Sequence, residues 1–455
     1  SGASSYGVRL DASSYNIIHN NSITTSGSAD AIRMSPGGQH YNNIASNTIT
    51  TSTNDARGIY IENSNNNTLR NNKIKTSHNI NAEGLYFVES IDGNAFYDSF
   101  VNASATNDVY FSYPSSGTIN LTNVTLADSA GPAFDSLSTA RANVQWYFDA
   151  LVNEIDNEAL NQANITAKNV SGAFAFSQLT DVNGRIPRQT ILEHWKNASV
   201  TRNQNNYTFN VSKSGFASLF RSINVTSNRD EVFILNPINN TINSCTTLNE
   251  SSTTYYLISN LNSTGTCINI TANNITLKGS NYKISYGTST SANVYGIQVI
   301  NANGTIIRNV IVQQVNPIGS GKAGIYLNKG NNAFIYNTSI TTNGTSAHGI
   351  RVTSSSFNVI SNNTIVTYGA TAHAIQPGAN SNVTSNNITT NGTGAGVSID
   401  ENVTIKENVI LIRWSAHGIQ AVWLKSVSVL YNNISNLVNG RGISFTLSGS
   451  DYAVI

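Results

Sequence analysis

The acidic residues are the first place to look for catalysis, because hydrolysis of a glycosidic bond needs two carboxyl groups at a defined separation. Asp400 and Glu401 form the only carboxylate pair within the repeats of the C-terminal half. Neighbouring residues on a strand point to opposite faces, so this pair does not converge on one substrate. The chain is therefore predicted not to be an enzyme, and no catalytic residue is assigned.

Three histidines, His348, His373 and His417, each stand immediately before a short apolar strand. The first two fall on successive repeats, which is a spacing that suits a metal ion, but no carboxylate or thiol completes a ligand set. The equivalent position in other repeats holds Tyr6, Asp30, Arg57, Glu83, Ala323, Ala395 and Arg441. A position that accepts so many residue types is typical of an exposed turn, where Asp30, Arg57 and Glu83 are expected to form charge pairs between repeats. No metal site and no cofactor are predicted.

Cys245 and Cys267 are the 2 cysteines of the chain, and their separation is about one repeat length. Equivalent residues of stacked strands lie about 4.8 Å apart, which is within the reach of a disulfide. Two free buried thiols are the alternative. We favour the disulfide, which would pin the first coils of the C-terminal repeat region.

Asn-x-Ser/Thr sequons occur somewhat more often than composition alone predicts. Asn337 and Asn387 coincide with a predicted buried ladder, where an amide cannot carry a glycan, whereas Asn303, Asn343 and Asn391 stand in Asn-Gly-Thr turns and are the better acceptors. The glycosylation candidates are Asn120, Asn164, Asn197, Asn224, Asn262, Asn303, Asn343, Asn391 and Asn402.

The element that positions these side chains is a repeated apolar strand that begins with glycine or alanine, as in Gly58-Ile-Tyr-Ile and Gly349-Ile-Arg-Val. Successive copies are roughly 22 to 28 residues apart, a spacing typical of stacked solenoid repeats. Apolar residues stand two apart within each copy, which is the period of a β-strand. Gly, Asn and Thr are too frequent for helical repeats. The pattern predicts the coils of a parallel β-helix.

An Asn-x-Ile-like element follows each of these strands at a nearly constant distance. In a β-helix such asparagines stack about 4.8 Å apart, and their amides hydrogen-bond along the axis as a ladder. Asp98 replaces asparagine in one coil and is expected to form a weaker rung. The predicted ladder consists of Asn21, Asn47, Asn72, Asn337, Asn363, Asn387 and Asn433.

Composition excludes several classes of protein. Only 11% of residues are charged and the formal net charge is +1, which argues against a nucleic-acid-binding protein. No run of about 18 apolar residues is present, so no membrane-spanning segment is predicted. Residues 1–10 are already patterned sequence rather than a signal peptide, and the scarcity of thiols favours a location outside the cytosol. The chain is expected to be a mature or trimmed extracellular segment.

The repeats are interrupted in the middle of the chain. Segments such as Val144-Gln-Trp-Tyr-Phe and Gly172-Ala-Phe-Ala-Phe are typical of strands of a small sandwich, and the turn Thr180-Asp-Val-Asn-Gly resembles one in transthyretin-like modules of surface proteins. The predicted fold class is therefore all-β, with two right-handed parallel β-helices separated by a small β-sandwich. The predicted domains are residues 1–132, 133–228 and 229–455.

Repeats of the Gly-Ile-x-Val and Asn-Asn-x-Ile kind resemble those of the periplasmic copper-binding-protein (NosD-like) β-helix family. The segment from Cys245 to Ile284, with its Thr264-Gly-Thr-Cys-Ile-Asn-Ile stretch, is similar to archaeal cell-surface proteins that begin their β-helices this way. The resemblance covers most of the chain outside the interruption. It implies a structural or adhesive subunit of an archaeal surface layer or surface filament, such as a hamus. The implied partners are other copies of the chain, surface glycans or other cells.

The alternative function is a carbohydrate-binding or carbohydrate-active β-helix protein. Such a binder needs carboxylates or aromatic rings on one face of several consecutive coils, and small hydroxyls and amides are expected there instead.

Two further features favour assembly. Strand edges left uncapped at the chain ends are expected to pair with flanking sequence or with neighbouring subunits. Coils near residue 410 carry apolar residues on both faces, so some of them must face outward unless loops cover them. The interface candidates are Leu411, Trp414, Trp423 and Leu424.

Overall fold

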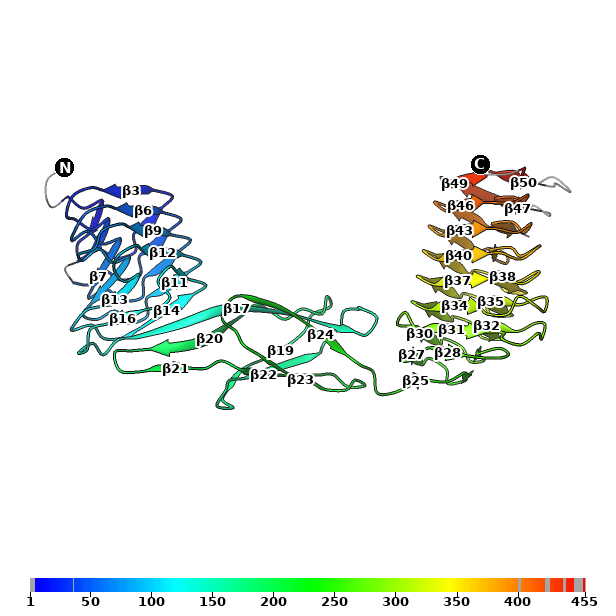
Figure 1. Cartoon of the computed structure of the whole chain (residues 1–455), viewed down its shortest axis with the longest axis horizontal. Helices are drawn as coiled ribbons and strands as arrows, with labels where there is room; N and C mark the ends of the chain where they lie inside the picture. Colours follow the sequence, from blue (N-terminus) through cyan, green and yellow to red (C-terminus); the bar gives the residue numbers. More distant parts are fainter. Residues whose placement is uncertain are drawn as a thin grey trace. The chain divides into compact units, whose positions relative to one another are not determined.

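The computed structural model describes residues 5–35, 37–399, 402–421, 426–436, 439–445 and 453–454. These residues form β-strands joined by turns, and no helix that could cross a membrane occurs among them. The strands stack coil on coil (Figure 1), so the all-β class and the parallel β-helix fold predicted from the repeats are confirmed. The chain divides into two compact units. Unit 1 is Ser1–Glu154 with Ala159–Leu235, and unit 2 is Ile155–Glu158 with Asn236–Ile455.

The coils of unit 1 form three parallel sheets, to which each coil contributes one strand. Sheet A contains β1 (Val8–Leu10), β4 (Ile32–Met34), β7 (Ile59–Glu62), β10 (Leu85–Val88), β13 (Val109–Phe111) and β16 (Ala133–Phe134). Sheet B begins with β2 (Ile17–His19), β5 (Asn43–Ala45), β8 (Thr68–Arg70), β11 (Ala95–Tyr97) and β14 (Thr118–Thr122). Sheet C contains β3 (Ser22–Thr25), β6 (Thr48–Thr51), β9 (Lys73–Thr76), β12 (Phe100–Ala103) and β15 (Thr125–Leu126).

The repeated strand motif has a simple physical basis in sheet A. Ile32 and Met34 are buried while Arg33 between them points outward, because side chains alternate along a strand. The glycine at the strand start allows close approach of the neighbouring coil. A Cβ atom on Gly58 would lie 2.4 Å from Cγ2 of Ile74 and 2.5 Å from the carbonyl oxygen of Gly84.

Sheet B continues beyond the coils through one long strand, β17 (Arg141–Glu154). This strand pairs in parallel with β14 and β24 (Arg229–Leu235) and antiparallel with β20 (Gln189–Lys196), which in turn pairs with β21 (Thr201–Asn203). A separate antiparallel sheet contains β19 (Phe174–Leu179), β18 (Asn164–Lys168), β22 (Tyr207–Ser212) and β23 (Leu219–Ile223). Its core joins that of the long strand, since Phe209 stacks on Phe148 with ring centroids 4.6 Å apart.

Unit 2 also has three parallel sheets. Sheet A′ contains β26 (Thr246–Leu248), β29 (Ile268–Ile270), β32 (Tyr295–Ile300), β35 (Ala323–Asn328), β38 (His348–Thr353), β41 (Ile375–Gln376), β44 (Val397–Ile399), β47 (Ile419–Ala421) and β50 (Ile443–Phe445). Sheet B′ contains β25 (Thr241–Ile242), β27 (Thr254–Leu257), β30 (Thr276–Lys278), β33 (Ile306–Arg308), β36 (Phe334–Tyr336), β39 (Val359–Ser361), β42 (Asn382–Thr384), β45 (Thr404–Lys406), β48 (Val427–Leu430) and β51 (Ala453–Val454). Sheet C′ contains β28 (Leu261–Asn262), β31 (Lys283–Tyr286), β34 (Ile311–Gln314), β37 (Ser339–Thr342), β40 (Thr364–Thr367), β43 (Asn387–Thr390), β46 (Val409–Ile412) and β49 (Asn433–Asn436).

A disulfide joins Cys245 to Cys267 in the first coils of unit 2, with their Cα atoms 4.6 Å apart. The predicted bond is therefore confirmed. The three-domain division of the chain at residues 132 and 228 stays a prediction.

Buried amide ladders run along the coils of both units. In unit 2, Nδ2 of Asn363 donates to Oδ1 of Asn386 at 3.0 Å and to the carbonyl oxygen of Ile335 at 2.9 Å. Asn386 donates in the same way to Asn408. Unit 1 has two ladders, which consist of Asn16, Asn42, Asn67 and Asn94 before the strands of sheet B and of Asn21, Asn47, Asn72 and Ser99 before those of sheet C.

The ladder of unit 2 differs by one residue from part of the predicted one. Its rungs around Asn363 are Thr338, Asn386, Asn408 and Asn432. The predicted rungs Asn337, Asn387 and Asn433 are exposed instead. The reason is the alternation of side chains around the start of each strand: the residue immediately before the strand turns into the coil, and the residues on either side of it face outward. The same alternation puts Ser99 in the ladder and leaves Asp98 exposed.

The ladder makes a testable contribution to stability. Asn363→Leu should lower the free energy of unfolding by about 1–3 kcal/mol, because it leaves buried backbone and amide groups of the neighbouring coils without partners. Chemical denaturation of the purified chain measures this difference.

Asn387→Leu is the matched control, since the exposed Asn387 is only one coil away and its replacement should change stability by less than about 0.5 kcal/mol. Equal losses for the two variants would contradict the assigned register.

Candidate functional site

A polar groove lies at the turns between sheet B and sheet C of unit 1. Its volume is about 570 Å³, within the range of small-ligand sites. The turn residues Asn71, Asp98 and Asn123 have positive φ angles of 53°, 50° and 52°, a conformation that Asn and Asp adopt more readily than most residues. The groove is lined by Asn71, Asn72, Lys73, Asp98, Ser99, Phe100, Asn123 and Thr125.

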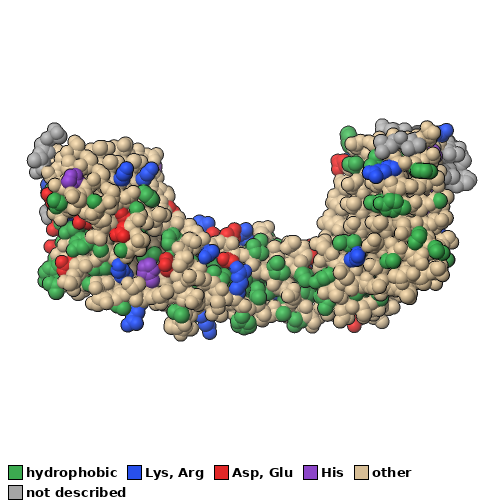
Figure 2. Space-filling view, in the orientation of Figure 1, with side chains coloured by type: hydrophobic (Ala, Val, Ile, Leu, Met, Phe, Trp, Pro, Cys, Tyr) green, Lys and Arg blue, Asp and Glu red, His purple; other side chains and the backbone are tan. Residues whose placement is uncertain are grey.

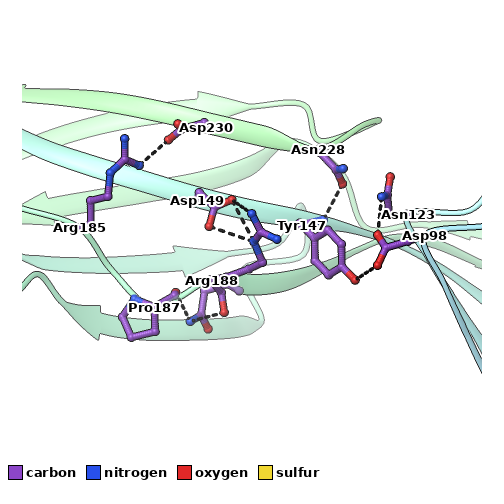
Figure 3. Close-up of polar contacts among 10 residues, drawn as sticks. Asp98, Asn123, Tyr147, Asp149, Arg185, Pro187, Arg188, Asn228 and Asp230 are labelled. Carbon is purple, nitrogen blue, oxygen red and sulfur yellow. Dashed lines mark hydrogen bonds and ion pairs between the residues drawn. The ribbon is translucent and has the colours of Figure 1, made fainter. Parts of the chain in front are cut away.

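Asp98 supplies the carboxylate of this groove, and each of its two oxygens accepts a hydrogen bond. Oδ1 accepts a hydrogen bond from Nδ2 of Asn123 at 2.6 Å, and Oδ2 accepts one from the hydroxyl of Tyr147 at 3.2 Å (Figure 3). Tyr147 comes from β17, so the long strand supplies a phenol to a carboxylate of the coils. Burial and then the nearby Asp98 raise the pKa of Tyr147. The phenol is therefore protonated at neutral pH and is a proton donor to Asp98.

Arg188 extends this polar cluster. Its guanidinium lies 4.9 Å from the centre of the Tyr147 ring and forms an ion pair of 2.8 Å with Asp149 (Figure 3). Tyr147 is thus oriented by two contacts. The guanidinium of Arg188 packs on its ring face, and its hydroxyl donates a hydrogen bond to Asp98. Arg185 and Asp230 form a separate exposed pair at 2.9 Å.

The surroundings of Asp98 are cationic and aromatic. Lys73 on β9 is exposed and lies in register with Phe100 on β12, and Lys75 and Arg70 are exposed on β9 and β8. Charged side chains are sparse on the face of the molecule in Figure 2, and most of those visible belong to unit 1. The groove therefore combines amides and hydroxyls, which match sugar hydroxyls, with an ammonium group that matches a carboxylate of a ligand.

A second cluster of functional groups runs along sheet A. Arg33, Tyr60, Tyr86 and Tyr110 occupy equivalent positions on successive coils. The rings of Tyr60 and Tyr86 stack with centroids 5.3 Å apart, and Arg33 lies 4.0 Å from the centre of the Tyr60 ring. Aromatic rings therefore converge on one face of consecutive coils. The expectation that only small hydroxyls and amides face outward is wrong for unit 1.

Buried acids support this cluster. Asp30 is 1% exposed and pairs with Arg33 at 3.0 Å, while Arg57 pairs with Asp30 at 3.8 Å and with Glu83 at 3.3 Å. Burial raises the pKa of Asp30, against the lowering effects of its bonds to Arg57 and Arg33. The predicted pairs between coils are present, but the position before the strand is not an exposed turn, because Asp30 and Glu83 are both buried there. Since the ring faces and the guanidinium groups are already occupied by one another, this cluster is mainly structural.

His348 and His373 occupy the same position in unit 2. Their rings stack with centroids 5.2 Å apart. Nδ1 of His348 accepts the backbone N–H of His373, and Nδ1 of His373 accepts that of Ala395. Each ring therefore joins one coil to the next through its Nδ1.

The remaining predicted site residues are dispersed. Trp414 is 58% exposed and Leu411 is half-buried. Trp423, Leu424, Asp400 and Glu401 lie outside the described residues. Among the glycosylation candidates, Asn224, Asn262 and Asn303 are exposed, whereas Asn120, Asn164, Asn197, Asn343, Asn391 and Asn402 are half-buried. Their modification stays a prediction.

Sequence reasoning missed the groove, although a signal was present. Asp98 was considered only as a replacement for a ladder asparagine. Asp98 is the turn residue before Ser99. It is therefore equivalent to Asn71 and Asn123, the outward-facing turn residues of the neighbouring coils. The signal in the sequence is a single carboxylate among otherwise uncharged turn residues, next to Lys73 and Phe100, and it indicates a candidate ligand site.

Comparisons with known proteins support the fold. The family model of the periplasmic copper-binding protein (NosD) matches residues 1–127, and no curated protein matches the chain in sequence. The structure is similar to that of a DFA-IIIase from Arthrobacter chlorophenolicus A6 without its lid, with 10% identity, a TM-score of 0.32 and coverage of 48% of this chain and 60% of that one. It is similar to the Dettilon tailspike protein, with 10% identity, a TM-score of 0.32 and coverage of 96% and 61%. It is also similar to a periplasmic alginate epimerase, with 9% identity, a TM-score of 0.28 and coverage of 95% and 76%.

These neighbours correct one prediction. Two of the three are enzymes by name, which contradicts the prediction that the chain is not an enzyme. Similarity at this level concerns the fold, and the chain spans only about three fifths of the length of the first two neighbours.

The histidine pair leads to a prediction about pH. Burial, followed by His373 and Arg351, lowers the pKa of His348 to about 3 from its ordinary 6.5. Between these two pH values the unfolded chain binds more protons than the folded chain, so the free energy of unfolding should fall as the pH falls through this window. Denaturation at a series of pH values measures the slope.

His348→Gln should flatten that slope, and His19→Gln, at an exposed position, should leave it as in the unmodified chain. An unchanged slope for His348→Gln would show that the imidazole is not held neutral.

Proposed function

We propose that the chain is a carbohydrate-active β-helix protein that binds an acidic polysaccharide along the groove of Asp98. The groove has the size of a ligand site and offers amides, hydroxyls, an aromatic ring and a lysine ammonium on neighbouring coils. These groups recognise the hydroxyls, the apolar ring face and the carboxylate of a uronate sugar. Successive coils repeat about every 4.8 Å, which suits a linear polymer that lies across several coils.

The observation that carries the proposal is the position of Asp98, held by Asn123 and Tyr147 with Lys73 beside it in the groove. Because both oxygens accept a hydrogen bond, the carboxylate keeps one orientation. A loosely held surface acid has no such partners. A fixed carboxylate next to a cation is the arrangement that a saccharide site needs.

Proton transfer is the reaction class that fits this groove better than hydrolysis by two carboxylates. Asp98 is the only carboxylate among the described groove-lining residues, and two-carboxylate hydrolysis needs a pair. Lys73 would neutralise the uronate carboxylate, so that a proton on the adjacent carbon becomes more acidic. Tyr147 and Asp98, linked by a hydrogen bond, are the groups through which a proton would pass.

A location outside the cytoplasm agrees with this function. The matching family model describes a periplasmic protein, one structural neighbour is the Dettilon tailspike protein, and a disulfide persists mainly in oxidising compartments.

A structural subunit of an archaeal surface layer or filament is the second candidate. Trp414, 58% exposed beside the exposed Arg413, supports it, because such residues are enriched at interface centres. Sedimentation of the full chain should then show self-association that Trp414→Ala weakens. A monomer at every concentration would contradict the assembly role.

Binding of an oligogalacturonate, compared with a cello-oligosaccharide of equal length, tests the first proposal. Isothermal titration should show at least about tenfold tighter binding of the acidic oligosaccharide. Lys73→Ala should weaken binding of the acidic oligosaccharide about tenfold, because it deletes one charge-assisted hydrogen bond.

Asp98→Asn should abolish any change in oligosaccharide chain length or stereochemistry detected by mass spectrometry and NMR. Asparagine tolerates the positive φ of this position, so the turn should be retained.

Lys168→Ala is the matched control. It removes an exposed lysine of β18 that is not among the groove residues, and its affinity should equal that of the unmodified chain. Equal binding of the acidic and neutral oligosaccharides, or equal effects of the two lysine variants, would contradict the proposal.

A further inference from the structure

A second cavity of unit 1 lies between the last coil and strand β20. Its volume is about 300 Å³, which is at the lower end of small-ligand sites. Thr125 lines both this cavity and the groove of Asp98, so the two adjoin. We call it the Glu193 pocket, and its polar lining residues include Glu193, His194 and Asp128.

A β-bulge gives the pocket its two principal polar groups. Strand β20 pairs His194 with Val144 and Leu192 with Gln145, so Glu193 has no partner residue on β17. Adjacent residues of a regular strand point to opposite faces. The extra residue breaks this alternation and allows Glu193 and His194 to line the same cavity. Bulges of this kind commonly re-aim side chains next to functional sites.

Each oxygen of the Glu193 carboxylate lies near a ring nitrogen. Oε2 accepts the N–H of Trp146, and Oε1 lies 3.5 Å from Nδ1 of His194. Burial opposes ionisation of Glu193, but hydrogen bonds from His194 and Trp146 outweigh it and lower the pKa. The carboxylate is thus charged at neutral pH and keeps one orientation, while 19% of its side chain stays exposed to a ligand.

The pocket also has apolar lining residues. Val124, Val144 and Pro132 are buried and line it together with the half-buried Trp146. Apolar side chains combined with a carboxylate and an imidazole match a pyranose ring, which has an apolar face and hydroxyl groups at its rim. Asp128 and Glu193 make the pocket acidic, and the nearby Lys196 donates to the carbonyl oxygen of Ala130.

We propose that the Glu193 pocket is a second saccharide subsite, which takes a non-acidic sugar ring at the end of the Asp98 groove. The proposal rests on the proposed function, because it makes the polymer in the groove a mixed one, with a uronate near Lys73 and a neutral or amino sugar in the pocket. Like charges disfavour a uronate carboxylate beside Asp128 and Glu193. The carboxylate of Glu193 accepts sugar hydroxyl groups, and Trp146 supports the ring.

Saturation-transfer NMR on the full chain tests this subsite with three probes: glucosamine, glucose and glucuronate. Glucosamine and glucose should bind the unmodified chain at least about tenfold more tightly than glucuronate. Glu193→Gln keeps the size of the side chain and an acceptor for Trp146, and should weaken binding of glucosamine about tenfold. Thr226→Trp fills the cavity from an exposed position of its rim and should abolish binding of both sugars with an unchanged circular dichroism spectrum.

The proposals for the groove and for the pocket can be contradicted independently of each other. Lys73→Ala should leave binding of glucose and glucosamine unchanged while it weakens binding of oligogalacturonate. If neither glucose nor glucosamine binds, or if Thr226→Trp and Glu193→Gln bind them as the unmodified chain does, the subsite is overturned whatever the oligogalacturonate shows. If the two sugars bind in the pocket but oligogalacturonate does not bind in the groove, the proposed function fails while the pocket stands as a saccharide site.

Discussion

Each coil of this chain has to place its backbone hydrogen-bonding groups over those of the coil before it, about 4.8 Å away. This constraint forces equivalent residues into columns. An inward column must be apolar, as with Ile49 and Ile74 of sheet C, or must satisfy its own hydrogen bonds, as the asparagine ladders do. The glycine position at the start of strands such as β7 is also constrained, because a Cβ on Gly58 would collide with the neighbouring coil.

The same constraint explains how the coils can carry a binding site at little cost in stability. A turn column that does not point into the coil has no part in core packing, so it tolerates replacement by residues that accept its backbone conformation. The turn column before sheet C requires residues that accept a positive φ, and Asp98 satisfies this requirement as well as Asn71 and Asn123 do. A carboxylate could therefore replace an amide there without disturbing the ladder at Ser99. The long strand β17 then adds Tyr147, which holds that carboxylate.

The features that follow from stacking were predictable from the sequence. The apolar period of two indicated the strands, and the one-coil separation of Cys245 and Cys267 indicated their disulfide. Other features depend on which of two adjacent polar residues turns inward, and composition does not distinguish them. For this reason the sequence predicts Asn387 as a rung where the structure has Asn386, and it predicts Asp98 as a rung although Asp98 lines the groove. The repeat pattern shows which residues of neighbouring coils lie next to Tyr60 and Asp30. It does not show how deeply Tyr60 and Asp30 are buried, because that depends on how side chains of successive coils stack on one another. The bulge at Glu193 has no counterpart in a repeat, since it arises from pairing of β17 with a strand distant in sequence.

The central claim is that a saccharide lies on the turn column of unit 1 at Asp98. Hydrogen exchange followed by mass spectrometry, on the full chain with and without saturating oligogalacturonate, tests this claim most directly. If the saccharide binds there, exchange should slow only in the peptides that contain residues 70–75, 97–100 and 123–126, because these backbone amides lie in and beside the groove. Slower exchange only in unit 2, or an unchanged pattern at a concentration that saturates binding, would contradict it.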